Sequence, residues 1–576
     1  MKLMTQKIRL LKSLLIVLII SSAPFRTDGQ ERLLDKKITL QVSKEKVETV
    51  LSHIESLSGV SFSYNSDIIP EDSLVSFSSV SKSIEKTLPI FLGKDFSFKS
   101  TGKYIIILQK NNRQELNPTK NKYTISGIVL DARTSRPLPL VTIYDMGSLE
   151  SVQSDSSGSF KLSVVPKTNY LAIRSSKSEY SDTVSVINPA LNESLLIKLF
   201  PVEKTLQKLD VIAIHEVPVS NFAGHRMIEK IVDKELLLNS QNVVIYDKRI
   251  AQLSLFPKVG TNLRMSGAVT NHFSINLLGG YSNGVAGFEA GGIVNINKND
   301  VDGFQASCLV NLTGRDVNGF QASGVLNLTK GNVNGCQISV ISNLGADTVK
   351  GVQAAGLVNV CDKKLSGLQL SPGVNISRGD ETGAQIAGLV NYAANPRFQL
   401  GLVNIADTSD GAPLGIINII RHGYYAFSLS ADELQTGYLL FSMGTRRLYS
   451  IVGVSGSTAN GQKSWGINYG LGSHFFYNHR LGLNVEFLSS VINAFGSFDS
   501  TMISRVSLST QMSLRIGQNF YLNAGPSINT FIADADNPDV DGFISATLPK
   551  NNWHYTSVNT RYDAWFGVSA GLKYRF

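Results

Sequence analysis

The chain has 576 residues and a formal net charge of +9, from 54 Lys and Arg against 45 Asp and Glu. This length allows about three or four domains, and a hydrophobic fraction of 43% excludes a disordered chain. A surplus of +9 is too dilute over this length to indicate a nucleic-acid partner. Only 17% of the residues are charged while 49 are Gly, so either the solvent contact or the helix content of this protein is unusual.

Residues 1–30 have the pattern of a secretory signal peptide. Four basic residues within the first twelve precede the apolar run 14–20, and small or polar residues follow. This run is too short for a membrane-spanning helix of about 20 residues. Since no other segment offers 18 uninterrupted apolar residues, a membrane-bound form of this chain would not be a helix bundle.

Residues 31–110 are expected to form a compact α+β unit with two strand–helix–strand halves. Apolar residues recur at helical spacing before Gly59 and again before Gly93, which are the expected helix stops. The order of elements resembles the N-terminal short domain of secretins and TonB-dependent receptors. That resemblance implies a TonB-like or anti-sigma-like periplasmic partner. The expected strands and helices lie, in chain order, at 38–42, 47–57, 60–64, 74–77, 81–91, 95–99 and 104–108.

Residues 123–200 contain only strand and turn patterns. Turns are expected at 131–137 and 155–158. The segment resembles the carboxypeptidase-regulatory-like β-sandwich of Bacteroidota outer-membrane proteins, which implies a structural module without a peptidase site. Where that family usually has Gly-Tyr this chain has Glu179-Tyr180, so one turn is expected to differ. The residues that carry the resemblance are Gly127, Val129, Asp131, Thr134, Pro137, Leu138, Val141, Asp155, Gly158, Phe160 and Leu162.

Residues 201–250 are more charged than their surroundings. One amphipathic helix is expected over 225–238, and we interpret the segment as a periplasmic connector. The three cysteines of the chain, Cys308, Cys336 and Cys361, lack metal-type spacing. We interpret them as small buried or lipid-facing residues.

Residues 251–423 are dominated by a sixteen-residue repeat, with glycines at this step from Gly287 to Gly383. The consensus is Gly-x-Gln-x-x-x-x-x-Asn, which resembles a bacterial surface-repeat family built on the same unit. Two looser copies end at Asn404 and Asn418. The repeated amides are Gln305, Gln321, Gln337, Gln353, Gln369, Gln385, Asn311, Asn327, Asn343, Asn359, Asn375 and Asn391.

The repeat has two structural interpretations. The copy at 319–329 alternates apolar and polar residues with a period of two, which predicts a strand. Its length fits the 9–11 residues of a tilted membrane strand, and an apolar face opposite a Gln and Asn face is typical of a barrel wall. We therefore expect the repeated amides to line the lumen of a barrel of about 16–18 strands. The alternative is a β-solenoid with one coil per repeat, which a strict period without insertions favours.

Residues 424–576 are expected to complete an outer-membrane β-barrel. Tight turns at 478–480 and 517–519 alternate with longer loops at 494–501 and 533–562, as periplasmic turns alternate with extracellular loops. The fold class is thus mainly β, with a C-terminal antiparallel barrel preceded by a small α+β domain and a β-sandwich. The last strand resembles the terminal strand by which the barrel assembly machinery recognises such proteins, through Phe566, Val568, Ala570, Leu572, Tyr574 and Phe576.

The chemistry-bearing residues form no catalytic or metal motif in the sequence. The eight His are scattered, and neither a His pair at metal spacing nor a nucleophile elbow is present. We expect a non-enzymatic outer-membrane barrel without cofactor, in contact with membrane lipid, that serves solute passage, uptake or surface attachment. One alternative is a TonB-dependent receptor or transducer, although no plug domain is visible. A second is a barrel-rim enzyme that uses loop residues Asp534, Asp536, Asp539, Asp541 and His554.

Overall fold

The computed structural model shows a mainly β protein that divides into two compact units, Met1–Val202 and Glu203–Phe576. Among the described residues, no helix is both long and apolar enough to cross a membrane. The expected signal peptide lies outside these residues. The structure describes residues 33–64, 69, 72–101, 104–109, 122–166, 171–187, 194–202, 226–243, 245, 248–379, 382–408, 410–458, 463–476, 480–494, 502–535, 538–549 and 552–576.

The first domain has the expected α+β order. Helix α2 (Val47–Ser58) ends at Gly59, whose φ of 68° is left-handed and therefore suits Gly. Both helices bury an apolar face in one core, with Val50, Ile54 and Leu88 fully buried. The other elements are α3 (Ile84–Leu92), the pair β1 (Lys37–Lys46) and β3 (Leu74–Ser83), and the sheet of β2 (Ser61–Ser63), β5 (Tyr104–Gln109) and β4 (Phe96–Thr101).

The second domain is a sandwich of two small sheets around one apolar core. Both expected turns are held by an aspartate: Asp131 accepts from the backbone of Arg133 and Thr134, and Asp155 from that of Ser157 and Ser159. One sheet contains β11 (Thr183–Ile187), β10 (Leu171–Ser176), β7 (Thr142–Asp145) and β8 (Ser151–Gln153). The other contains β12 (Leu195–Leu199), β6 (Tyr123–Asp131) and β9 (Ser159–Val164).

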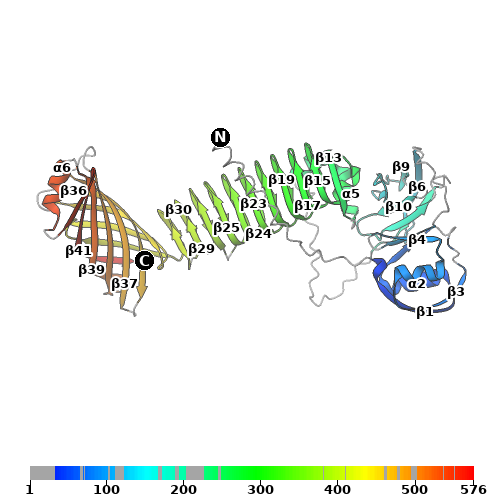
Figure 1. The fold of residues 1–576 in the computed structure, drawn as a ribbon, viewed down its shortest axis with the longest axis horizontal. Helices are drawn as coiled ribbons and strands as arrows, with labels where there is room; N and C mark the ends of the chain where they lie inside the picture. The colour runs from blue at the N-terminus through cyan, green and yellow to red at the C-terminus, as the bar shows by residue number, and fades with distance from the viewer. Residues whose placement is uncertain are drawn as a thin grey trace, which may run out of the picture. The chain divides into compact units, whose positions relative to one another are not determined.

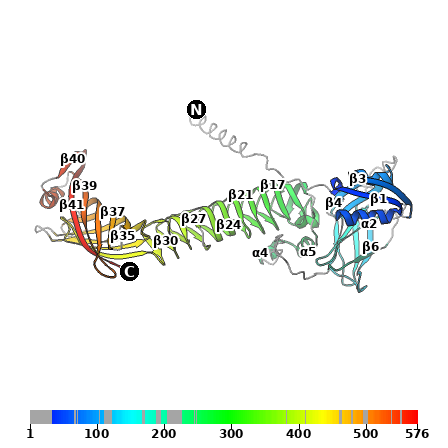
Figure 2. The same ribbon diagram turned by 90° about the horizontal axis from the view of Figure 1, so that it is seen from below.

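The repeats form a parallel β-solenoid and not barrel strands, so our preferred interpretation of 251–423 is wrong and its alternative is confirmed. Each strand pairs in parallel with the strand one coil later, with like residues in register, as Gln305 with Gln321 and Asn311 with Asn327. Figures 1 and 2 show the coils as a stack of short arrows in green and yellow-green.

A single coil consists of a longer strand, a corner, a shorter strand and a polar turn. In the coil of β21 (Val317–Ser323) and β22 (Leu326–Thr329), the corner falls at residues 324–325. The stretch expected as one membrane strand is therefore bent into two. The other coil strands are β13 (Arg249–Phe256), β14 (Val259–Gly260), β15 (Thr270–Asn276), β16 (Gly279–Ser282), β17 (Gly284–Gly291), β18 (Val294–Asn297), β19 (Val301–Ser307), β20 (Val310–Thr313), β23 (Val333–Ser339), β24 (Ser342–Ala355), β25 (Val358–Ser371), β26 (Val374–Ser377), β27 (Thr382–Ala387), β28 (Val390–Ala393), β29 (Pro396–Leu400), β30 (Val403–Ala406), β31 (Ala412–Leu414) and β32 (Ile417–Ile420).

The expected single connector helix is two helices, α4 (Arg226–Ile231) and α5 (Lys234–Asn242). The chain turns at Asp233, whose side chain caps α5 by accepting from the Glu235 amide. Ile228, Val232 and Leu236 pack against Tyr281 and other residues of the first coils. The connector thus covers part of the outer face of the solenoid.

The C-terminal region is a closed antiparallel barrel of eight strands, because β33 (Tyr424–Ala431) pairs with β41 (Thr560–Arg575). The expectation of 16–18 strands is wrong, since the repeats contribute none. The strands between them are β34 (Gly437–Gly444), β35 (Tyr449–Ser457), β36 (Ser464–Phe476), β37 (Leu481–Ala494), β38 (Met502–Arg515) and β39 (Phe520–Asp534). The short β40 (Trp553–Ser557) extends the sheet beside β41, and α6 (Pro538–Thr547) lies in the β39–β40 connection.

Candidate functional site in the barrel interior and the solenoid core

The barrel has a polar inside and an apolar outside. All eight strands expose a large apolar side chain, and Leu429 on β33 and Val568 on β41 are 63% and 65% exposed. Many of the alternate positions are buried and polar, as with Asn468 between Ile467 and Tyr469. The outward row, in strand order, is Leu429, Leu439, Val454, Ile467, Phe487, Leu508, Leu522 and Val568.

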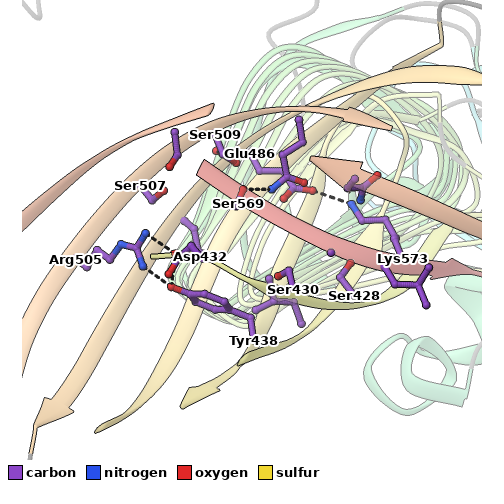
Figure 3. Close-up of a pocket in the computed structure, with 17 residues that line it drawn as sticks. Ser428, Ser430, Asp432, Tyr438, Glu486, Arg505, Ser507, Ser509, Ser569 and Lys573 are labelled. Carbon is purple, nitrogen blue, oxygen red and sulfur yellow. Dashed lines mark hydrogen bonds and ion pairs between the residues drawn. The ribbon is translucent and has the colours of Figure 1, made fainter. Parts of the chain in front are cut away.

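One ion pair crosses the interior between Arg505 and Asp432 (Figure 3). The Arg505 guanidinium lies 2.6 Å from the Asp432 carboxylate, and the two side chains are 3% and 6% exposed. Tyr438 donates its hydroxyl to Asp432 at 2.8 Å, and Arg505 donates to Tyr438 and, at 2.9 Å, to Asn529. These hydrogen bonds compensate the burial of both charges.

The turn after β33 folds back into the barrel and places Glu433 there as an acceptor. Its carboxylate accepts from Trp565 Nε1 at 2.6 Å, from Asn529 Nδ2 at 3.2 Å and from the Val568 amide at 3.1 Å. The Arg505 guanidinium carbon lies 5.7 Å from the Trp565 ring centroid, within the range of a cation–π contact. The turn is thereby joined to β38, β39 and β41.

A second ion pair links Lys573 on β41 to Glu486 on β37 (Figure 3). The Lys573 Nζ lies 2.9 Å from the Glu486 Oε1, which also accepts from the Tyr449 hydroxyl at 2.8 Å. Lys573 also lies 5.7 Å from the Tyr449 ring centroid. Three strands that are not neighbours along the chain thus meet at one carboxylate.

An apolar cluster closes the end of the barrel opposite Tyr424 and Phe576. Leu434 from the β33–β34 turn and Phe543 and Ile544 from α6 are buried there with Phe531 and Trp565. The two ion pairs line a cavity of about 50 Å³ in the interior. Eight strands enclose a space that side chains can fill. Side chains therefore fill much of the interior in the described part of the barrel.

The core of the solenoid is a ladder of glutamine side chains that donate in one direction. Gln321 Nε2 donates to Gln305 Oε1 at 2.6 Å, and Gln337 Nε2 donates to Gln321 Oε1 at 2.7 Å. The series continues coil by coil to Gln399. Each amide thus satisfies the next, and all of these side chains are fully buried.

A second ladder, of asparagines, donates in the opposite direction along the chain. Asn311 Nδ2 donates to Asn327 Oδ1 at 2.9 Å, and the chain of contacts continues to Asn418. Asn327 also donates to the backbone carbonyl of Ile338 at 2.8 Å. The Asn side chains therefore tie both strands of each coil to the next coil.

The glutamine ladder begins at Glu289, which occupies the Gln position of the first regular coil. Its carboxylate accepts from Asn276, Asn297 and Gln305 at 2.6–2.9 Å. A carboxylate, which accepts hydrogen bonds and donates none, fits this end because every neighbouring amide donates toward it. Complete burial raises the pKa of Glu289, and the amide hydrogen bonds oppose part of this rise.

The repeated amides predicted to line a lumen are therefore core residues of the solenoid, and that expectation is corrected. All twelve are fully buried, because in-register amides satisfy one another without water. The terminal-strand residues do face outward, with Phe566, Val568 and Phe576 63–67% exposed. Their role in assembly remains a prediction.

The loop residues named for a rim enzyme are only partly described. Asp536 and the side chains of Asp539 and Asp541 lie outside the described residues. His554 Nδ1 lies 3.0 Å from Asp563, and its Nε2 lies 3.1 Å from the Thr556 hydroxyl. Arg561 also donates to Asp563 at 2.5 Å. The contact between His554 and Asp563 joins β40 to β41.

The sequence pattern placed charged residues on the inward face without pairing them. Lys573 alternates with the outward row of β41, but nothing local connects it with Glu486.

Within the described part of the chain, no group of three or more His, Cys, Asp or Glu is arranged to hold a metal ion. No family model, curated protein or solved structure matches the chain. The fold defines a closed eight-stranded barrel joined to a parallel β-solenoid.

Proposed function

We propose that the chain is a non-enzymatic outer-membrane protein whose barrel is a closed anchor for the solenoid and the two N-terminal domains. One observation carries the proposal: the barrel buries ion pairs and exposes a large apolar residue on all eight strands. That polarity suits lipid outside and polar contacts inside. It is the reverse of a water-soluble barrel, whose apolar side chains point inward.

Within this proposal, surface attachment is favoured over solute passage. The Arg505–Asp432 pair and the apolar cluster around Phe543 lie in the path that a solute would follow. The order of modules would also suit a TonB-dependent receptor. An eight-stranded barrel filled by its own side chains leaves no space for a plug, however, which disfavours that alternative.

The N-terminal domains and the solenoid would lie in the periplasm. Tyr424 begins and Phe576 ends at the same end of the barrel, since the Phe576 amide donates to the Tyr425 carbonyl. The strand pairs β34–β35, β36–β37 and β38–β39 meet at this end with only four residues between the two strands of each pair, a length typical of periplasmic turns. The TonB-like or anti-sigma-like partner would then contact the 31–110 module, and a pull-down with that module as bait tests it.

The proposal is tested by membrane fractionation, by migration on unboiled gels and by conductance in planar bilayers. We expect recovery in the outer membrane, faster migration before boiling and no single-channel steps. Recovery as a soluble periplasmic protein would contradict the anchor. Regular conductance steps would instead support solute passage.

A further inference from the structure

The solenoid exposes a row of aliphatic side chains, with a glycine at one position, at the corner between the two strands of each coil. Leu309, Leu357 and Leu389 at this corner are 44%, 55% and 54% exposed. We call this row the apolar ridge. Its positions are Ile293, Leu309, Val325, Ile341, Leu357, Gly373, Leu389, Leu402 and Ile416.

The strand faces on both sides of the apolar ridge are apolar as well. Phe288, Phe304 and Phe320 stack on one side with centroids 5.3 Å apart. On the other side the outward positions carry aliphatic residues such as Val374 and Val390, which are only half-buried. The repeated Gln and Asn side chains are inside the coil. The solenoid is therefore apolar outside and polar inside around this corner.

The opposite corner of the coil is charged. Asp347 pairs there with Lys363 at 2.7 Å, and Asp362 pairs with Arg378, in each case one coil apart. These side chains are 39–68% exposed. A cross-section of the solenoid thus has one apolar and one charged corner, the polarity of an element that lies in a membrane interface.

Several backbone amides of the apolar ridge pair with the carbonyl of the ridge residue one coil earlier. The Leu309 amide donates to the Ile293 carbonyl, the Val325 amide to the Leu309 carbonyl, and the Leu357 amide to the Ile341 carbonyl. Hydrocarbon tolerates a backbone only when its polar groups are satisfied internally. The stacked corner meets this condition at these positions.

The apolar ridge is continuous with the outer wall of the barrel. Gly415, which precedes Ile416, accepts a hydrogen bond of 3.2 Å from the hydroxyl of Tyr469. Tyr469 lies on the outward face of β36 and is 36% exposed. The last ridge residue therefore adjoins the surface that we assign to lipid.

We propose that the apolar ridge of the solenoid lies against the lipid of the membrane in which the barrel is anchored. This inference rests on the proposed function. The ridge is convex, because it follows a turn, and strands spaced about 4.8 Å apart give it a length of about 40 Å. A fluid bilayer accommodates such an edge without the matched groove that a protein partner would need, and the charged corner then remains in water.

The test measures lipid exposure by spin labelling of the full chain in vesicles of phosphatidylethanolamine and phosphatidylglycerol. One label occupies Cys308, an exposed thiol beside Leu309, with Cys336→Ser and Cys361→Ser removing the other thiols. The control label occupies Asn318→Cys in a chain that also carries Cys308→Ser, because Asn318 is exposed outside the ridge. A third label, at Leu439→Cys in the same thiol-free background, reports the barrel wall.

We expect the label at 308 to collide severalfold more with oxygen than with a water-soluble nickel chelate, and the label at 318 to show the reverse. Equal nickel accessibility at 308 and 318 would overturn the inference. Shielding of 308 from both reagents would overturn it in favour of a protein contact, such as a second copy of the chain. A lipid-exposed label at 439 in either case shows that only the ridge, and not the barrel anchor, has been misassigned.

Discussion

Asn418 Nδ2 donates a hydrogen bond of 2.7 Å to Ser450 Oγ, so the asparagine ladder of the solenoid ends on a strand of the barrel. Ser450 donates in turn to the Gly415 carbonyl, and both side chains are fully buried. The last coil is thus capped by β35. An open end of the stack would otherwise present unpaired strand groups.

Replacement of Ser450 by Ala should weaken this junction. The Asn418 amide would lose its best acceptor in a buried site, which costs about 1–3 kcal/mol. We expect a lower urea midpoint for the solenoid, followed by a fluorophore on the exposed Cys308. Ser428→Ala is the control, because Ser428 is buried in the barrel with no hydrogen-bond partner. Equal shifts for both variants would show that the junction contributes nothing.

Replacement of Asn327 by Ala in the middle of the ladder should destabilise the solenoid more strongly. It removes donations to Asn343 and Ile338 and takes from Asn311 one of its two acceptors, the Asn327 side chain. Two or three unsatisfied buried groups cost on the order of 3–5 kcal/mol together. Hydrogen exchange of the neighbouring coils should accelerate accordingly. The control Asn318→Ala, on the exposed face of the preceding strand, should change the exchange by less than tenfold, since exposed polar contacts contribute about 1 kcal/mol or less.

Replacement of Gly335 by Ala should disrupt the stack for a steric reason. Gly335 has a φ of 140°, and an added Cβ would lie 2.0 Å from the Gly319 carbonyl oxygen of the previous coil. We expect a loss of more than about 2 kcal/mol, measured as the urea midpoint of the Cys308 reporter. Gly437→Ala provides the comparison, because nothing lies within 4 Å of a Cβ at that position. A variant at 335 as stable as the parent would refute the close coil-to-coil approach.

The stability of the solenoid should decrease as pH rises above the ordinary glutamate value of 4.5 and through the raised pKa of Glu289. The folded-state pKa of Glu289 is raised above its ordinary value of 4.5 by burial. The unfolded chain therefore releases this proton at lower pH than the folded chain. The stabilisation that protonated Glu289 contributes is complete below the ordinary pKa of Glu and is lost as pH rises through the raised pKa. Glu289→Gln should remove most of this slope. Asp300→Asn should remove only a part, since burial raises the pKa of Asp300 in a less enclosed site.

The Glu486–Lys573 pair gives a double-variant test of the barrel interior. Lys573→Met alone would leave Glu486 buried without its counter-ion, which costs about 3–5 kcal/mol. Adding Glu486→Gln should restore much of the folded fraction on unboiled gels across a urea series. If the double variant were as unstable as the single one, packing of Lys573 and not its charge would be the cause.

The sequence predicted the β content, the two small domains and the period of sixteen. It favoured barrel strands over a solenoid for the repeats, however, and the structure shows the solenoid. Alternating polar and apolar residues indicate a strand with one wet face. Here the polar face is the dry one, because Gln321 and Asn327 find identical partners one coil away. Only the register between coils shows whether the polar face meets water or the core. The strict spacing from Gly303 to Gly319 and Gly335 was the signal for that register.

The barrel site was predictable in kind and not in detail. Alternation along β41 identifies Lys573 as inward-facing, but its partner Glu486 is separated by 87 residues. Tight turns and the terminal strand were readable because they are local. The turn residues Glu433 and Leu434 fold into the barrel for reasons that lie on other strands, Trp565 and Phe531 among them.

The two opposed amide ladders allow the solenoid to change its length by whole coils. The regular coils repeat the same amide-to-amide hydrogen bonds, with Glu289 at the start of the glutamine ladder and Ser450 at the end of the asparagine ladder. Deleting or inserting a whole sixteen-residue unit therefore leaves both ends chemically unchanged and alters the reach by about 4.8 Å. Gains and losses of repeats would set the distance between the barrel and the first coil of the solenoid, with no need for a new interface.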